Sequence, residues 1–135
     1  MRSNTIKLSE ELLVGLEEKL GKSYIVSSQF ASGSIGDISF ELRPDLTIKN
    51  NETGKITVVE IKGSNPEDDL PLATISDLKR IKSANRAVNP DFLLVSVSNV
   101  PDQLKQDLHE EGIRVIQWVE KEDVVDEIIL TIDNS

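Results

Sequence analysis

The chain has 135 residues and a formal net charge of −9, which arises from 24 acidic and 15 basic side chains. Disulfides and thiolate metal sites are excluded because it has no cysteine, and a histidine metal site is excluded because His109 is its only histidine. The length suits one domain, 1–135, with an acidic C-terminal segment, 120–135; the sequence shows neither a secretory leader nor a membrane span, so we expect a cytoplasmic protein without membrane contact.

The N-terminal third predicts one helix followed by strands. Residues 10–20 carry leucines at helical spacing, with Ser9 as the expected N-cap and Gly21 as the stop. Residues 24–30 read as a strand, and residues 38–42 as a short extended piece.

A hairpin is predicted between Arg43 and Gly63. Two β-branched apolar stretches flank a polar loop, 51–54, in which Gly54 supplies the left-handed residue. If residues 50 and 55 close this loop, an unbulged register pairs 48 with 57, 46 with 59 and 45 with 60. Because side chains alternate along a strand, the apolar residues of this register share one face and three charged residues share the other. The charged residues are Asp45, Glu60 and Lys62.

This trio has the chemistry of a metal-dependent phosphodiesterase. Opposed carboxylates repel each other unless something compensates them, and a divalent cation would do so. Asp45 and Glu60 offer the hard oxygen ligands that Mg²⁺ or Mn²⁺ takes alongside phosphate oxygens. Lys62 would orient or deprotonate the attacking water or stabilise the transition state. The competing interpretation is that all three are ordinary charges on the solvent face of a hairpin.

The remaining elements alternate between helices and strands. A polar loop, 63–70, precedes a helix that Pro71 opens and that runs to about residue 88. Residues 92–97 and 113–119 read as strands on either side of a helix that starts at 101–102 and ends at Gly112. The tail is weakly helical from residue 120, with an extended piece at 128–132. This order predicts an α/β fold with a mixed sheet flanked by helices.

Pro44-Asp45 followed by Glu60-Ile61-Lys62 resembles the PD-(D/E)xK motif of the restriction-endonuclease-like nuclease superfamily. The order of elements resembles its αβββαβ core over nearly the whole chain. The resemblance implies a Mg²⁺-dependent DNA endonuclease, with DNA as substrate and a homodimer as in many compact members. Such enzymes serve DNA repair or recombination, among other pathways.

The resemblance also nominates further acids. In many such nucleases the first helix adds a carboxylate to the metal, and Glu10 is the candidate here, with Glu11, Glu17 and Glu18 as alternatives. Asp37, which follows a Ser-Gly loop, is a fallback for Asp45. Residues 77–81 resemble the helical Gln-Leu-x-x-Tyr motif of several subfamilies, with Asp77 in place of Gln, so Asp77 is either a modified site residue or a surface acid.

The charge distribution keeps a second function open. From Asp102 onward ten acids face three bases, whereas the second helix presents a basic stripe that could grip a phosphate backbone or simply be solvated. The stripe consists of Lys79, Lys82 and Arg86. The overall acidity favours the alternative of a non-catalytic nuclease-fold module in a nucleic-acid-processing complex, with a protein partner at the acidic C-terminal region.

Overall fold

The computed structural model describes residues 2–28, 45–86 and 89–133, and the side chains from Lys7 onward. Within these ranges the first half contains α1 (Arg2–Leu20), a 3₁₀ turn η1 (Gly21–Ser23), β1 (Tyr24–Ser28), β2 (Leu46–Asn50) and β3 (Ile56–Lys62). The second half contains α2 (Thr74–Ala84), β4 (Asp91–Ser96), α3 (Asp102–Glu110), β5 (Ile113–Gln117) and α4 (Lys121–Asp133). No helix in the described ranges has the length and apolar character required to cross a membrane.

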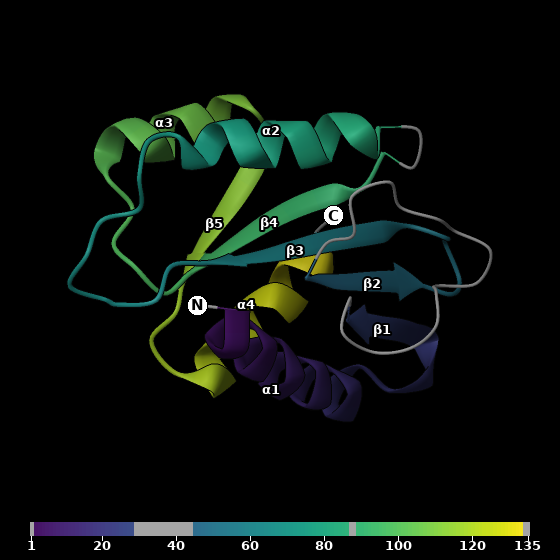
Figure 1. The fold of residues 1–135 in the computed structure, drawn as a ribbon. Helices are drawn as coiled ribbons and strands as arrows, with labels where there is room; N and C mark the ends of the chain where they lie inside the picture. Colours follow the sequence, from purple (N-terminus) through teal and green to yellow (C-terminus); the bar gives the residue numbers. More distant parts are fainter. Residues whose placement is uncertain (1, 29–44, 87–88, 134–135) are drawn as a thin grey trace.

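The strands form one mixed sheet in the order β1-β2-β3-β4-β5. The β1-β2-β3 part is an antiparallel meander, whereas β3, β4 and β5 run parallel. Helices α2 and α3 lie over one face of the sheet, and α1 and α4 lie over the other (Figure 1). The prediction of an α/β fold with a mixed sheet flanked by helices is therefore confirmed.

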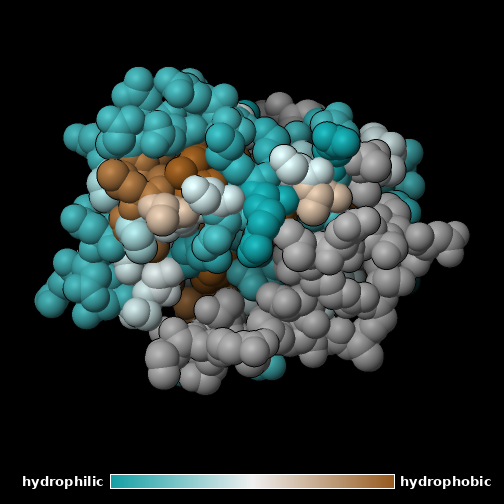
Figure 2. Space-filling view, turned by 45° about the horizontal axis from the view of Figure 1, so that its top comes forward, coloured by the Kyte–Doolittle hydropathy of each residue, from teal (hydrophilic) through white to brown (hydrophobic). Residues whose placement is uncertain are grey.

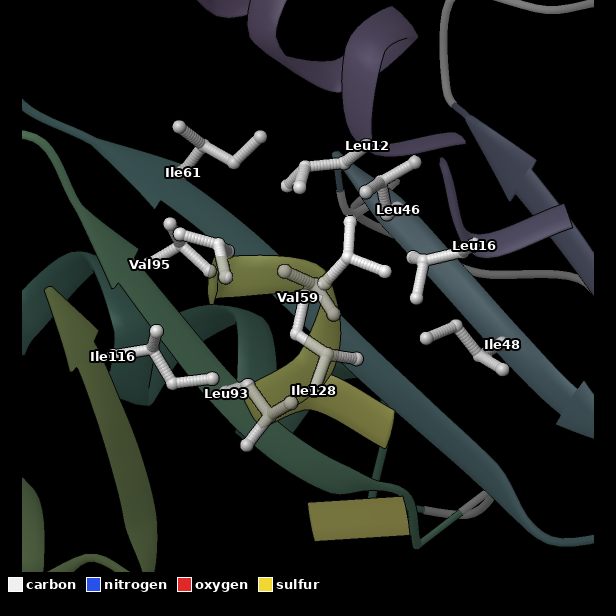
Figure 3. Packing of buried hydrophobic residues seen from close by; sticks show 12 residues of the cluster. Leu12, Leu16, Leu46, Ile48, Val59, Ile61, Leu93, Val95, Ile116 and Ile128 are labelled. Carbon is white, nitrogen blue, oxygen red and sulfur yellow. The ribbon is translucent and has the colours of Figure 1, made fainter. Parts of the chain in front are cut away.

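Two apolar clusters hold these layers together. In Figure 3, Leu12 and Leu16 of α1 and Ile128 of α4 lie against one face of the sheet. The other face carries Ile56 and Val58 of β3, which belong to a cluster with Leu78 of α2 and with Leu104 and Leu108 of α3. Both faces of β3 are thus covered, which explains its nearly continuous apolar sequence.

The predicted hairpin register is confirmed. Leu46 pairs with Val59 and Ile48 with Thr57. Asn50 closes the loop by donating its N–H to the Lys55 carbonyl at 2.9 Å, and its side-chain oxygen accepts the N–H groups of Glu52 and Thr53. Gly54 has φ +76°, the left-handed conformation that the loop was expected to need.

The predicted start of the first helix is wrong. The helix begins at Arg2, and Ser9 lies inside it, fully buried. Ser9, Leu12 and Leu16 share the buried face, so the stripe that packs on the sheet starts a turn earlier than the leucine pattern suggested. Gly21, with φ +68°, does end the helix, before η1.

The predicted bounds of the second helix are too wide. Residues 71–73 form turns, in which the Thr74 N–H donates to the Pro71 carbonyl at 3.0 Å, before α2 starts. The helix ends at Ala84, where the Asn85 side-chain amide also donates to the Ile81 carbonyl and the Arg86 N–H donates to the Ser83 carbonyl in a tighter turn. The strands at 24–30, 92–97 and 113–119 were predicted within one or two residues of β1, β4 and β5 where the structure describes them.

The predicted extended piece at 128–132 is also wrong, because this segment belongs to α4. Its branched aliphatic residues favour a strand locally, but they recur at helical spacing and pack against the α1 side of the sheet. The buried ones are Val124, Val125 and Ile128.

Figure 2 turns the molecule so that the α2 and α3 side comes forward. Most described residues on this face are hydrophilic, and hydrophilic residues surround one apolar patch. The hydrophilic surface agrees with a composition in which 29% of residues are charged.

Candidate functional site

Asp45 and Glu60 face each other where β2 begins. The Asp45 N–H donates to Glu60 Oε2 at 2.7 Å, and the Ile61 N–H donates to Asp45 Oδ2 at 2.8 Å. Each carboxylate therefore accepts a backbone hydrogen bond from the neighbouring strand. The paired register ends at Leu46 and Val59, and these two side-chain contacts bring Asp45 and Glu60 together just beyond it.

Both acids are buried, with Asp45 7% and Glu60 4% exposed. The alternative interpretation, that they are ordinary charges on a solvent face, is therefore wrong for this pair. Glu60 lies on the same face of β3 as Ile56 and Val58, the face that the cluster with α2 and α3 covers. Burial of a carboxylate costs free energy unless it is paired or hydrogen-bonded, so this arrangement needs compensation.

Glu60 is the perturbed member of the pair. Burial is the largest cause that raises its pKa, from an ordinary value of 4.5 to about 8. The negative charge of Asp45 and a hydrogen bond to its side chain raise the pKa further, whereas the Asp45 backbone N–H and the Lys62 ammonium lower it. Near neutral pH and without a cation, Glu60 is therefore mostly protonated.

Lys62 lies at the end of β3 and is half-buried. It is two residues beyond Glu60, so both side chains leave the same face of the sheet. Its backbone carbonyl accepts the Val97 N–H at 2.9 Å, which fixes the strand end against β4. The three residues of the predicted trio therefore occupy neighbouring positions at one end of the β2–β3 pair.

The donor set fits a small divalent cation. Two carboxyl groups side by side supply hard oxygens, and a bound cation would favour the ionised form of Glu60 that burial and the Asp45 charge oppose. Among the residues the structure describes, no group of three or more acidic, histidine or cysteine side chains could hold a metal ion. Asp45 and Glu60 would thus supply two protein ligands. Mg²⁺ is often held by two carboxylates, with waters and substrate oxygens completing its coordination shell.

Of the further acids, Glu10 and Asp77 are not brought to this pair. Glu10 is exposed on α1, which packs on the sheet face opposite to the Glu60 side chain. Asp77 is exposed in the first turn of α2. Neither belongs to a metal-holding group in the described ranges, and Asp37 lies outside the described residues.

The basic stripe of α2 is partly engaged within the protein. The Lys82 ammonium donates to the Glu111 carbonyl just after α3, and the Lys79 ammonium lies 3.9 Å from the Glu111 carboxylate. Arg86, beyond the end of α2, is exposed. Lys79 and Lys82 therefore support the packing of α2 beside the C-terminus of α3, where cations interact favourably with the helix dipole.

Sequence reasoning missed the packing that encloses the strand end. Gly63 has φ +90°, and a Cβ there would lie 2.6 Å from Ser98 Oγ. The Gln117 amide donates to the carbonyls of Ser96 and Ser98, which ties β5 to the loop after β4. A glycine directly after the Glu-x-Lys triplet was the one available signal; the contacts of Ser98 and Gln117 are long-range and leave no local pattern.

Comparison with known proteins supports the fold. No protein-family model and no curated protein matches this chain. The crystal structure of the protein of unknown function AF1548 is similar, with a TM-score of 0.56 at 12% sequence identity. The alignment covers 82% of this chain but 58% of that one, so this chain spans less than two thirds of its length. At this identity the likeness shows a similar fold alone.

Proposed function

We propose that this chain is a Mg²⁺-dependent DNA endonuclease whose active site is formed by Asp45, Glu60 and Lys62. The observation that carries the proposal is the buried carboxylate pair, in which each acid is fixed by a backbone N–H of the other strand. If these two positions served only to pack the core, apolar side chains there would make the folded state more stable than two buried acids do.

The proposed division of roles follows from position and chemistry. Asp45 and Glu60 would hold Mg²⁺, or Mn²⁺, which when bound supplies charge neutralisation and an activated water for attack on phosphorus. The backbone hydrogen bonds keep both carboxylates aimed at one place and remove the need to order them on binding. Lys62 would orient the attacking water or stabilise the charge that develops on the phosphoryl oxygens.

We assign the chain to the restriction-endonuclease-like fold on the same basis. The elements α1 to β4 follow the αβββαβ order of that superfamily, and the antiparallel meander passes into a parallel pair at β3, the strand that carries Glu60 and Lys62. α3, β5 and α4 would then be additions to the core. A single domain that acts as a homodimer on DNA completes this proposal.

The test is a cleavage assay with single-stranded, duplex, supercoiled and branched DNA in the presence of Mg²⁺ or Mn²⁺. Asp45→Asn, Glu60→Gln and Lys62→Met should each abolish cleavage, whereas Glu67→Gln, an exposed acid in the loop after β3, should leave it unchanged. Circular dichroism would check that each variant is folded. If the wild-type protein cleaves none of these substrates, or if Asp45→Asn keeps full activity, the proposal is wrong.

The second candidate is a non-catalytic module in a nucleic-acid-processing complex. It is favoured by the acidic charge of the chain and by the engagement of Lys79 and Lys82 with Glu111, which removes cations from a phosphate-binding surface. In that case Asp45 and Glu60 share a proton as a structural pair, and the partner binds the acidic C-terminal region. Cation binding distinguishes the nuclease from the non-catalytic module, since a purely structural acid pair would not bind Mg²⁺ or Mn²⁺.

A further inference from the structure

Strand β5 is an edge of the sheet, with β4 as its only neighbour among the described strands. The Trp118 N–H donates to the Ser96 carbonyl at 2.7 Å, so residue 118 directs its backbone groups toward β4. Because these groups alternate in direction along a strand, residues 114 and 116 also face β4, and residues 113, 115 and 117 face outward. An outward row of N–H and C=O groups is a template for another strand.

This edge forms the floor of a groove between two helices. The groove has a volume of about 760 Å³ and runs between α3 and α4 along most of β5. Lys105 and His109 line it from α3, and Glu127 and Thr131 line it from α4. The strand contributes Arg114 together with apolar side chains such as Val115. The edge is therefore recessed between two walls rather than lying on a flat surface.

The charge of the groove is opposite to that of its surroundings. From Asp102 onward the chain has three basic residues, and two of them, Lys105 and Arg114, line this groove. His109, the single histidine of the chain, lies beside them. Within the described part of the chain neither Lys105 nor Arg114 forms an ion pair. Glu127 is the one acidic residue of the lining.

We infer that this groove binds an extended acidic segment of a partner protein as a sixth strand beside β5. The outward backbone groups of residues 113, 115 and 117 would supply the hydrogen bonds of strand addition. Side chains of the added strand point alternately toward α3 and α4. Acidic side chains on the α3 side would meet Lys105 and His109, which gives the groove its preference for an acidic segment.

A second copy of this chain fits the edge less well. Two β5 strands paired antiparallel about a two-fold axis would place both α3 helices on the same side of the joined sheet. Lys105 and His109 would then face their own copies across the interface, as would Glu127 on the α4 side. The like charges of the two Lys105 side chains, and of the two Glu127 side chains, oppose pairing, whereas an acidic strand meets Lys105 with opposite charge.

The experiment uses a fluorescent peptide in which glutamate alternates with valine, and a matched peptide with lysine in place of glutamate. Fluorescence anisotropy should show saturable binding of the glutamate peptide and binding of the lysine peptide at least about tenfold weaker. Lys105→Glu should weaken binding of the glutamate peptide about tenfold, and Lys22→Glu, exposed before the opposite edge strand, should not change it. Val115→Pro removes an outward N–H without removing a bond to β4, and should abolish binding.

Hydrogen exchange locates the contact. The glutamate peptide should protect the amides of Ile113, Val115 and Gln117, and should leave those of β1 unchanged. The inference is overturned if the glutamate peptide does not bind, if Lys105→Glu binds it like the wild type, or if protection appears elsewhere. A dimer in sedimentation that Val115→Pro dissociates would also overturn it, in favour of a second copy, and protection of the same amides by duplex DNA would do so in favour of nucleic acid.

Discussion

Glu60→Gln should stabilise this protein at alkaline pH, although it replaces a residue of the proposed active site. Glu60 is protonated in the folded state up to a pKa of about 8, whereas in the unfolded chain it ionises near 4.5. Between these values the unfolded state binds fewer protons, so the free energy of unfolding falls as the pH rises. Glutamine resembles the protonated acid in shape and still accepts the Asp45 N–H, but it has no charge to bury.

The size of this change in unfolding free energy follows from the raised pKa of Glu60. One pKa unit corresponds to about 1.4 kcal/mol, so the wild-type protein should lose about 3 to 4 kcal/mol of unfolding free energy between about pH 5 and pH 8 through this residue alone. That loss is a large fraction of the stability of a domain of this size. Glu60→Gln should match the wild type near pH 5 and exceed it by several kcal/mol at about pH 9.

Urea unfolding monitored by circular dichroism, in a chelating buffer at several pH values, measures this difference. Glu67→Gln is the matched control, because Glu67 is exposed and its replacement should leave the pH dependence of stability as in the wild type. The reasoning is refuted if wild type and Glu60→Gln keep a constant difference in unfolding free energy across the range, because Glu60 would then not be held protonated by the fold.

The carboxylate pair, Gly63 and Lys82 can each be tested by substitution. Adding Mg²⁺ at about pH 8.5 should raise the melting temperature of the wild type but not of Asp45→Asn or Glu60→Gln in differential scanning calorimetry, and an equal rise in all three would place the cation elsewhere. Gly63→Ala should lower the free energy of unfolding in urea by about 3 kcal/mol or more, because the added Cβ would collide with the Ser98 backbone and the residue would keep φ +90°. Gly54→Ala, at φ +76° but with open space around it, should lower it by about 1 kcal/mol. Equal losses in the two variants would contradict the role of Ser98. Lys82→Met should lower the free energy of unfolding by about 1 kcal/mol because the Glu111 carbonyl loses its donor, whereas Arg86→Met should leave it unchanged. Equal stability of the two variants in the same urea experiment would contradict this role of Lys82.

The hairpin was predictable because its determinants are local. Asn50, Gly54 and Lys55 fix the loop, and period-two alternation then fixes which residues oppose each other. The opposition of Asp45 and Glu60 followed by counting. Their burial did not follow from the alternation, because it depends on α2 and α3 covering the second face of β3. The continuous apolar run around Val58 was the signal that both faces are covered.

Other features needed long-range contacts that leave no local trace. Residues 128–132 of α4 were predicted to be extended from their branched aliphatic side chains, and packing of α4 against the α1 side of the sheet decides in favour of a helix. Lys79 and Lys82 read as a free basic stripe, because Glu111 lies far from them in sequence. Glu10 was nominated because the first helix of many such nucleases adds a carboxylate to the metal, yet the helix that carries it here packs on the other face of the sheet.

The most direct test of the central claim is a crystal of this protein soaked with Mn²⁺ at about pH 8.5, where Glu60 ionises readily. An anomalous difference map should show one ion bound by carboxylate oxygens of both Asp45 and Glu60, and an Asp45→Asn crystal soaked in the same way should show none. A well-ordered wild-type site without an ion, its two carboxyl groups still hydrogen-bonded to each other, would contradict the claim that this pair is a divalent-cation site.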